Sequence, residues 1–439
     1  MTVIGCSGSP SDEGSDLPDN APPVDPAPID PPPIVAPPAG FFSQEADGST
    51  WVLDGPARTV DYDAGANTDG WGQALLRVGD VLLVGGDFVG IKPSRTGPVT
   101  SRPFLAALDA LSGQPVSTFQ VPPQVDSVVR SLVLSPDREQ VYVGGDFGLL
   151  ALNAATGALE MAVSVSGGGD SGGRVFDTAV ADTHLYIGGD FSAVDGQPRS
   201  NIARLSLDGE LDPSWSPNVA LGLSAGRSAP VESVAVSPSG NTVYVGGTFQ
   251  KINDVAAPTT PQNQKVSMLS LSADGGTVLP ERFLPDVFEG GKPVTAHDIA
   301  VTEFYVIVAW GGVNHLTFHS PGGDRLKQYN SEGDVQFLQV LGDHVYVGHH
   351  GEFFGSETNP IPPEAVESLE PRVLVPYKFH SFRIDDPSFE PEQSWRISGT
   401  YGVWGVAAAA DSVWVAGEIS RAGSNELSVE GLARFPAVD

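Results

Sequence analysis

Cysteine is nearly absent from this sequence, because Cys6 is the single one among 439 residues. An internal disulfide framework is therefore excluded. Basic residues are also scarce, with 23 Lys and Arg against 54 Asp and Glu and a formal net charge of −31. Nucleic acids and anionic membrane surfaces are bound through clustered Lys and Arg, so we expect neither as a partner. The acidity predicts a well-solvated surface.

Long apolar runs are missing too, since no stretch approaches the roughly 18 consecutive apolar residues that a transmembrane helix needs. Glycine and proline, in contrast, are abundant, with 52 and 38 residues. Residues 1–40 combine many of these prolines with acidic residues and contain no Lys or Arg. Such a segment cannot bury enough apolar surface to fold. We therefore expect a disordered, Pro-rich acidic tether over 1–40 and a folded domain over 41–439.

The cysteine lies at the start of this tether, in the stretch "VIGCS" at 3–7. The stretch resembles the lipobox of bacterial lipoproteins, in which the cysteine is lipidated and becomes the mature N-terminus. The resemblance implies lipidation at Cys6 and anchoring to the bacterial envelope, at the outer membrane or cell surface. Only five residues precede Cys6, fewer than a signal peptide needs. This interpretation therefore requires a signal segment upstream; otherwise Cys6 is an ordinary free thiol.

One sequence unit recurs along the rest of the chain. Each copy is an apolar, β-rich run that ends in small residues, most clearly Gly-Gly-Asp-Phe. The copies read "VLLVGGDF" (81–88), "VYVGGDF" (141–147), "LYIGGDF" (185–191), "VYVGGTF" (243–249), "VIVAWGG" (306–312), "VYVGHHGEF" (345–353) and "VWVAGEI" (413–419). An alternating run and a turn precede each copy. A third run and then a short fourth run that ends near an aromatic residue follow it.

Four short runs per unit, with almost no helical periodicity, predict the four antiparallel strands of a β-propeller blade. We expect an all-β fold, a β-propeller of seven four-stranded blades. The last copy stops after its third run, whereas the segment 49–63 offers an extra strand. We expect this N-terminal strand to complete the last blade, so that the ring closes without open sheet edges. The repeated glycines are expected to serve close approaches of the backbone.

The third copy carries the fullest version of the repeat. Its matching residues are Tyr186, Ile187, Gly188, Gly189, Asp190, Phe191, Val194, Gly196, Arg199, Ile202, Ala203, Arg204, Leu205, Asp208, Gly209 and Asp212. This pattern resembles the bacterial delta-60-type repeat, a β-propeller family of no assigned activity. The resemblance is strong in the first four copies and weak in the last three. It implies a propeller located outside the cytoplasm and implies no particular chemistry.

The stretch "GDSGG" at 169–173 matches the pentapeptide around the nucleophilic serine of trypsin-like proteases. In those enzymes the histidine base precedes the serine along the chain. Here the first histidine, His184, follows Ser171, and Arg174 stands where the protease pattern has proline. We therefore interpret 169–173 as a loop between blades and not as a protease site.

Seven of the eight histidines lie in one part of the chain, in the copies that depart most from the repeat. His349 and His350 replace the Gly-Asp of the repeat, and Glu352 follows closely. Equivalent strand ends converge on one face of a propeller, so these residues would meet His315 or His319 of the preceding blade. Imidazoles with a carboxylate suit a transition metal such as zinc or copper. The alternative is that they are surface histidines in degenerate repeats.

The stretch "DYDAGANTDG" at 61–70 spaces oxygen-bearing side chains as calcium loops do. It departs from the EF-hand pattern, because Gly65 takes the third ligand position and no glutamate stands at the twelfth. Turn-forming Asp and Asn explain the stretch equally well, so both interpretations stay open. The candidate calcium ligands are Asp61, Asp63, Asn67 and Asp69.

No P-loop, dinucleotide fingerprint or cysteine nucleophile occurs, and no cofactor is expected. We predict a non-enzymatic, extracytoplasmic lipoprotein, a monomer held to the membrane only by its lipid, whose propeller binds a protein or glycan. Long irregular loops are the expected contact surface, above all 351–371, where Phe353 and Phe354 are candidate anchors. The alternative is a propeller enzyme, a metal-dependent hydrolase or a quinone-cofactor dehydrogenase, with its site on the face near blades five and six.

Overall fold

The computed structural model describes residues 42–47, 52–59, 66–93, 97–168, 173–222, 229–261, 263–286, 294–331, 333–350, 373–374, 378–399 and 402–438. The chain divides into two units, residues 1–33 and 34–439, and all described residues belong to the second. Every element assigned in these residues is a β-strand. The described ranges accordingly hold no helix long and apolar enough to cross a membrane.

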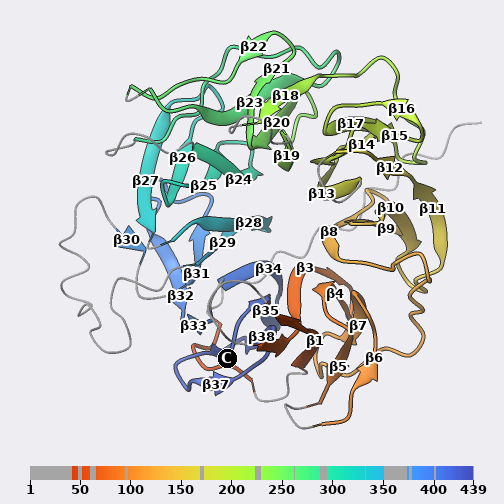
Figure 1. Cartoon of the computed structure of the whole chain (residues 1–439). Helices are drawn as coiled ribbons and strands as arrows, with labels where there is room; N and C mark the ends of the chain where they lie inside the picture. Colours follow the sequence, from red (N-terminus) through yellow and green to blue (C-terminus); the bar gives the residue numbers. More distant parts are fainter. Residues whose placement is uncertain are drawn as a thin grey trace, which may run out of the picture. The chain divides into compact units, whose positions relative to one another are not determined.

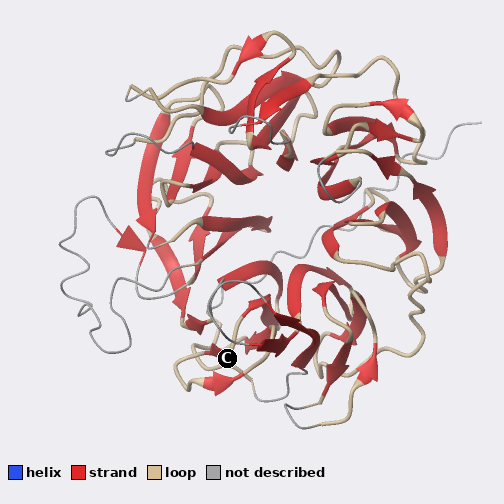
Figure 2. Ribbon diagram, viewed as in Figure 1, coloured by secondary structure: helices blue, strands red, loops and turns tan. Residues whose placement is uncertain are grey.

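The strands form successive antiparallel groups that stand around a common centre (Figure 1). Figure 2 shows the same arrangement as strands joined by loops. One strand of each group lies innermost and contacts the innermost strand of the next group, and the last of these strands lies beside the first. The innermost strands are β3 (Trp71–Val78), β8 (Val129–Leu134), β13 (Arg174–Val180), β19 (Val231–Val236), β24 (Val294–Val301), β28 (Val335–Leu341) and β34 (Gly402–Ala409).

The second strand of each group carries the repeated sequence unit. All seven copies expected to be strands form one, and each pairs antiparallel with its innermost strand. Their apolar runs are buried because each group packs between two neighbours, so both faces need apolar side chains. These strands are β4 (Val81–Asp87), β9 (Gln140–Gly145), β14 (His184–Asp190), β20 (Thr242–Gly247), β25 (Val306–Gly311), β29 (His344–His349) and β35 (Ser412–Glu418).

The third strands follow the repeat as expected, but the fourth run forms a ladder only in part. The third strands are β7 (Leu105–Asp109), β10 (Gly148–Asn153), β17 (Ile202–Ser206), β23 (Val266–Ser272), β26 (His315–His319), β31 (Phe379–Arg383) and β38 (Leu432–Pro436). The assigned fourth strands are β11 (Leu159–Val163), β27 (Arg325–Ser331) and β32 (Pro391–Trp395). In three other groups the fourth run makes a single bridge. Pro115, Pro213 and Pro280 lie in or beside those runs, and proline cannot donate a ladder hydrogen bond.

Hydrophobic clusters fill the spaces between neighbouring groups. Leu83 of β4 shares one cluster with Val141 of β9, and Leu82 of β4 shares another with Trp414 of β35. The first and last groups therefore bury apolar surface against each other. A parallel pairing of β23 with β24 joins two successive groups into one eight-stranded sheet that ends at β30 (Val373–Leu374). Because the ladders do not divide into separate four-stranded sheets, the number of blades stays a prediction.

The segments that connect the main strands form additional short sheets. In the first of them, β1 (Val52–Thr59) pairs with β2 (Ala66–Asp69) and with β5 (Gly90–Lys92), which pairs with β6 (Thr100–Ser101). The others are β12 (Val165–Ser166) with β15 (Ala193–Val194) and β16 (Gln197–Pro198), β18 (Val219–Gly222) with β21 (Phe249–Ile252) and β22 (Val255–Ala256), and β33 (Ile397–Ser398) with β36 (Arg421–Ala422) and β37 (Leu427–Ser428). The expectation that segment 49–63 completes the last blade is therefore wrong, since its strand pairs within the first group's connection.

Residues 42–47 lie along β38, at the edge of the last group. The amide nitrogens of Ser43 and Asp47 donate to the carbonyl oxygens of Pro436 and Arg434 at 2.7 and 2.8 Å. The Arg434 guanidinium also contacts the Asp47 carboxylate at 2.6 Å. Completion of the last blade by an N-terminal strand stays a prediction, and these residues stand where such a strand would lie.

Candidate functional site

Each innermost strand contains a β-bulge near its start. In β3, Gly72 pairs with Gly86 and Ala74 with Gly85, which leaves Gln73 as an extra residue. The other six innermost strands skip one residue in the same way. A bulge bends the strand and re-aims the side chain of the extra residue. The seven extra residues, called the bulge ring from here on, are Gln73, Arg130, Phe176, Glu232, His297, Gln336 and Trp404.

The paired glycines of the repeat make room for these bulges. A Cβ atom on Gly85 would lie 2.4 Å from Val129 Cγ1 on the next innermost strand. A Cβ atom on Gly86 would lie 1.9 Å from the carbonyl oxygen of Trp71, across the bulge. Both distances are too short for any residue with a side chain. The expectation that the repeated glycines serve close backbone approach is confirmed.

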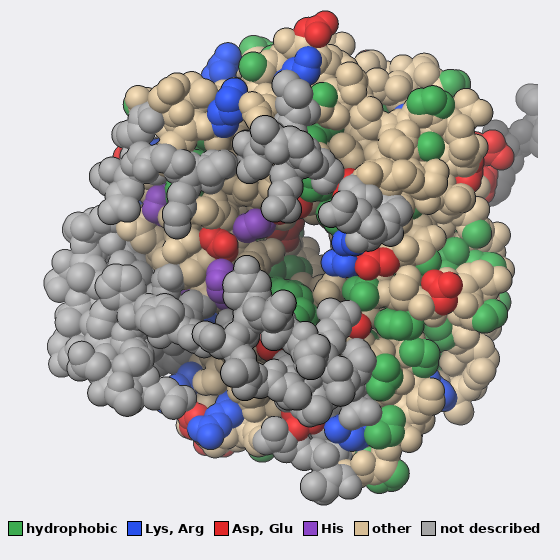
Figure 3. All heavy atoms as spheres, viewed as in Figure 1, with side chains coloured by type: hydrophobic (Ala, Val, Ile, Leu, Met, Phe, Trp, Pro, Cys, Tyr) green, Lys and Arg blue, Asp and Glu red, His purple; other side chains and the backbone are tan. Residues whose placement is uncertain are grey.

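The bulge ring surrounds a cavity of about 950 Å³ between the innermost strands. All seven ring side chains line this cavity and are half-buried. Further along the strands the lining becomes apolar, as at Val180, Val236 and Val301. Figure 3 shows side chains of both charges and histidines around the central opening of one face. A concave space of this size, with apolar walls and a few convergent polar groups, is typical of a ligand site. We call the end of the cavity at the bulge ring the mouth.

One cation of the bulge ring is held by a carboxylate of its own group. Arg130 Nε and Nη2 donate to the Asp146 carboxylate at 2.5 and 3.1 Å, a bidentate pair. Both side chains are about one-quarter exposed. The Arg130 guanidinium also lies 5.2 Å from the centre of the Phe176 ring, a cation–π contact with the next ring residue. This part of the mouth is therefore ordered by its own contacts before any ligand arrives.

The second cation is His297, which lies between two carboxylates. Its Nδ1 is 2.6 Å from Glu232 Oε2, and its Nε2 is 3.8 Å from Asp334 Oδ2. Burial alone would lower the pKa of His297, but hydrogen bonds and charges from Asp334 and Glu232 raise it to about 10. The imidazole is therefore protonated at neutral pH, and its positive charge is balanced by the two carboxylates.

Another part of the mouth, made by the ring residues Gln73, Gln336 and Trp404 and the neighbouring Trp71, is uncharged. The rings of Trp71 and Trp404 meet edge to face, with centroids 5.4 Å apart and planes at 79°. The Trp404 indole nitrogen donates to Gln336 Oε1 at 2.5 Å. Gln73 lies on β3, on the other side of Trp404 in strand order, and lines the same cavity. Both tryptophans are half-buried, so part of each ring reaches the mouth.

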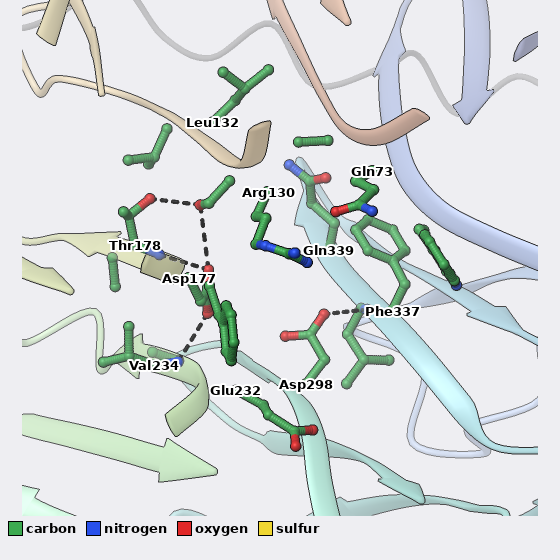
Figure 4. Close-up of a pocket in the computed structure, with 18 of the residues that line it drawn as sticks. Gln73, Arg130, Leu132, Asp177, Thr178, Glu232, Val234, Asp298, Phe337 and Gln339 are labelled. Atoms are coloured by element: carbon green, nitrogen blue, oxygen red, sulfur yellow. Dashed lines mark hydrogen bonds between the residues drawn. The ribbon is translucent and has the colours of Figure 1, made fainter. Parts of the chain in front are cut away.

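Two carboxylates just past the bulge ring connect neighbouring innermost strands (Figure 4). Asp177 accepts a hydrogen bond from the amide of Val234 on the next strand at 2.9 Å. Asp298 accepts one from the amide of Leu338 at 2.7 Å and one from the hydroxyl of Ser233 at 3.1 Å. Burial raises the pKa of Asp177 to about 6. Burial, and then the charge of Asp177, raise the pKa of Asp298 to about 7.

The histidines expected to form a metal site lie on the third strand of one group and at the end of the second strand of the next. His315 and His319 lie on the third strand β26, and His319 bonds to a hydroxyl of its own strand at 2.8 Å. His349 ends β29, and its Nε2 faces Nε2 of His380 on β31 at 3.2 Å, while His350 follows β29. Among the described residues, no three His, Cys, Asp or Glu side chains form a group that could hold a metal ion. The metal role of His315, His319, His349 and His350 therefore stays a prediction, because the carboxylate expected to join them, Glu352, lies outside the described residues.

Several predicted residues lie outside the described part of the chain, so their lipidation, metal and ligand roles stay predictions. They are Cys6, Asp61, Asp63, Ser171, Glu352, Phe353 and Phe354. Asn67 and Asp69 belong to strand β2, where they pair with Arg58 and Asp54 of β1. Part of the predicted calcium stretch is thus an extended, paired strand and not a loop.

None of the bulge ring residues was expected as a site, although the sequence holds a signal for them. The position before each ring residue is small or apolar in every copy: Gly72, Val129, Val175, Val231, Ala296, Val335 and Val403. The ring position itself holds glutamine, arginine, phenylalanine, glutamate, histidine and tryptophan. In every copy a polar or aromatic ring residue thus follows a small or apolar one, and this step is the signal in the sequence.

A family model described as "Domain of unknown function (DUF5122) beta-propeller" matches residues 181–214. Together with the strand arrangement, this match shows an all-β, β-propeller fold. No curated protein matches the chain.

The solved structures similar to this chain include two β-propeller domains. One is the WD40 β-propeller domain of Doa1, at a TM-score of 0.45 and 10% identity over 89% of this chain and 97% of that chain. The other is the β-propeller domain of Myceliophteria thermophila Cps50 (Swd1), at a TM-score of 0.48 and 8% identity over 84% and 97%.

Proposed function

We propose that this protein is a non-enzymatic binding module that takes an exposed part of its ligand into the mouth of the propeller. The observation that carries the proposal is the bulge ring, in which seven equivalent bulges direct seven half-buried side chains around one cavity. Bulges typically re-aim a side chain beside a functional site. The scaffold sets where these side chains stand, and their chemical variety serves recognition.

The internal contacts of Arg130 and His297 favour recognition over proton transfer at these two residues. Arg130 is engaged by Asp146, and His297 is protonated between Glu232 and Asp334. A general base must be able to accept a proton near neutral pH, and a histidine with a pKa of about 10 does not do so. These groups supply fixed hydrogen-bonding atoms, which suits recognition of a polar ligand.

The proposal includes a location outside the cytoplasm. Its support is the lipobox-like stretch at Cys6, the Pro-rich acidic segment after it and the likeness of the repeat to the delta-60 type. In this proposal a monomeric propeller stands away from the envelope on a lipid-anchored tether. Labelled palmitate fed to cells that express the full gene should enter the wild-type protein and not the Cys6→Ser variant. Label in both proteins, or in neither, would overturn this location.

A blocking substitution at the mouth tests the binding role. Gln73→Trp adds bulk inside the cavity, and the ring position already accepts a tryptophan at Trp404. Gln197→Trp is the matched control, because Gln197 is exposed on the short strand β16. The probes are one array of immobilised oligosaccharides and one of immobilised peptides. Wild type and the control should bind the same array members, and Gln73→Trp should lose them at least about 10-fold. Absence of binding by wild type, or undiminished binding by Gln73→Trp, would contradict the proposal.

A further inference from the structure

The uncharged part of the mouth has the chemistry of a sugar site. Resting on the proposed function above, we infer that Trp71, Trp404, Gln73 and Gln336 form a subsite for a neutral sugar ring of a glycan. A sugar presents an apolar face of C–H groups and a rim of hydroxyls that both donate and accept hydrogen bonds. A matching site therefore needs an aromatic surface bordered by groups that also donate and accept.

The tryptophan pair supplies the aromatic surface. The two rings meet edge to face, so the pair brings aromatic surface in two planes to the cavity that both residues line. Trp71 and Trp404 are both half-buried and both line the cavity. By contrast, the largest fully buried side chains include four other tryptophans, Trp215, Trp310, Trp395 and Trp414, which belong to the packing between groups. The mouth pair is thus distinguished from the core tryptophans by its access to the cavity.

The two glutamines supply the polar border. The indole of Trp404 donates to Gln336 Oε1, which fixes the amide so that its nitrogen carries two N–H donors beyond this bond. Gln73 and Gln336 lie on β3 and β28, the strands on either side of β34 and Trp404. Two amides on opposite sides of an aromatic ring can meet hydroxyls at both edges of one sugar. This arrangement of uncharged amides therefore suits a polyol better than a charged ligand.

The charges of the mouth point to a neutral ligand. Arg130 and His297 already bind carboxylates of the protein, so an acidic sugar would have to compete with them. Arg174 also lines the cavity, but it begins β13, three innermost strands away from β34. A neutral sugar at the tryptophan pair needs no counter-charge and breaks neither ion pair.

The intact protein carrying Trp51→Phe, which removes the one tryptophan outside the described residues, provides a fluorescence readout. Because the other four tryptophans are fully buried, a ligand at the mouth should change emission and acrylamide quenching mainly through Trp71 and Trp404. The probes are maltotriose, cellotriose, laminaritriose, chitotriose and, as the acidic counterpart, trigalacturonate. At least one neutral trisaccharide should shift the emission and protect it from acrylamide, and trigalacturonate should not.

Two substitutions on one strand locate the subsite. Gln336→Ala should weaken binding of that neutral sugar by roughly 3- to 10-fold, the effect of losing neutral hydrogen bonds. Gln339→Ala, further along β28 in the same cavity, should leave affinity within about 2-fold. Equal melting temperatures show that both variants are folded.

The outcomes separate this inference from the binding role itself. The neutral-sugar subsite would be overturned by any of three results: no change in tryptophan emission with any neutral sugar, preference for trigalacturonate, or equal effects of Gln336→Ala and Gln339→Ala. Ligand binding that Gln73→Trp still blocks would then leave the proposed function standing. Sugar binding that Gln73→Trp does not affect would overturn both.

Discussion

Replacing Asp177 and Asp298 together with asparagine should flatten the dependence of folding stability on pH. Both carboxyls have a higher pKa in the folded chain, about 6 and about 7, than the ordinary value of 3.8. Folding therefore takes up protons, and this stabilisation is complete below about pH 4. It is lost as the pH rises through 6 and 7, because buried carboxylates then become charged.

The size of the effect follows from the two pKa shifts. One unit of pKa difference corresponds to about 1.4 kcal/mol, so the pair would contribute up to about 7 kcal/mol in a dry interior. Asp177 and Asp298 are half-buried and line a cavity that water can enter. Solvent in the cavity reduces the contribution to about 3 kcal/mol. For a folded region of this size that corresponds to about 4 °C in melting temperature.

Urea and thermal unfolding at pH 5 and pH 8 measure the effect directly. Between these values wild type should lose about 1.5 kcal/mol more than the Asp177→Asn/Asp298→Asn variant, because roughly half of the 3 kcal/mol is already lost between pH 4 and pH 5. The control is Asp182→Asn/Asp208→Asn, which removes the same charge at two exposed positions and should follow wild type. If the Asp177/Asp298 variant and this control show the same loss between pH 5 and pH 8, the two carboxyls are not held as described.

Three further predictions concern the scaffold and the mouth. Gly85→Ala should cost about 2–4 kcal/mol, because its Cβ would meet the next strand at 2.4 Å, whereas Gly275→Ala, whose nearest neighbour is 3.8 Å away, should cost under about 0.5 kcal/mol; equal urea midpoints would contradict this. Arg77→Ala should cost about 1 kcal/mol at pH 7, because Arg77 binds Asp411 at 2.5 and 2.8 Å between the first and last groups. Since Arg77 lowers the pKa of Asp411 below its ordinary value of 3.8, that difference should shrink in thermal melts as the pH falls below 3.8, and a difference that does not shrink would refute the pairing. The His297 imidazole should stay protonated at pH 8 in ¹⁵N NMR spectra, and a midpoint near 6.5 would show that its carboxylate partners are not engaged.

The positions of the strands could be predicted from the sequence because each copy of the repeat marks the same strand of a group. A run such as Val141-Tyr142-Val143 before two glycines predicts a strand that is buried on both faces. The structure has a strand at each copy of the repeat. The partner of the N-terminal strand was not readable. Segment 49–63 has strand-forming residues, but its strand β1 pairs with the short strand β5 (Gly90–Lys92) and not with the last group. Local propensity says that a strand forms, and tertiary contacts decide where it pairs.

The site was less predictable because it depends on irregularities of the strands. Side chains alternate regularly between the two faces of an ideal strand, and a bulge breaks that alternation at a point that becomes recognisable only when all the copies are compared. The sequence favoured the histidines as site residues because histidine is rare in this chain and chemically versatile. Their positions on β26 and β29 place them among buried third and second strands, where His349 and His380 bond to each other. The mouth is lined from the innermost strands.

Hydroxyl-radical footprinting of the wild-type protein, with and without a ligand found on the arrays, tests the central claim most directly. Tryptophan, phenylalanine and histidine are readily oxidised, so Trp71, Phe176, His297 and Trp404 report on the mouth, while Phe304, 57% exposed, reports on surface away from it. Bound ligand should lower the oxidation of the mouth residues and leave that of Phe304 unchanged. Unchanged oxidation at the mouth, with protection elsewhere on the propeller, would show that the ligand binds at another site.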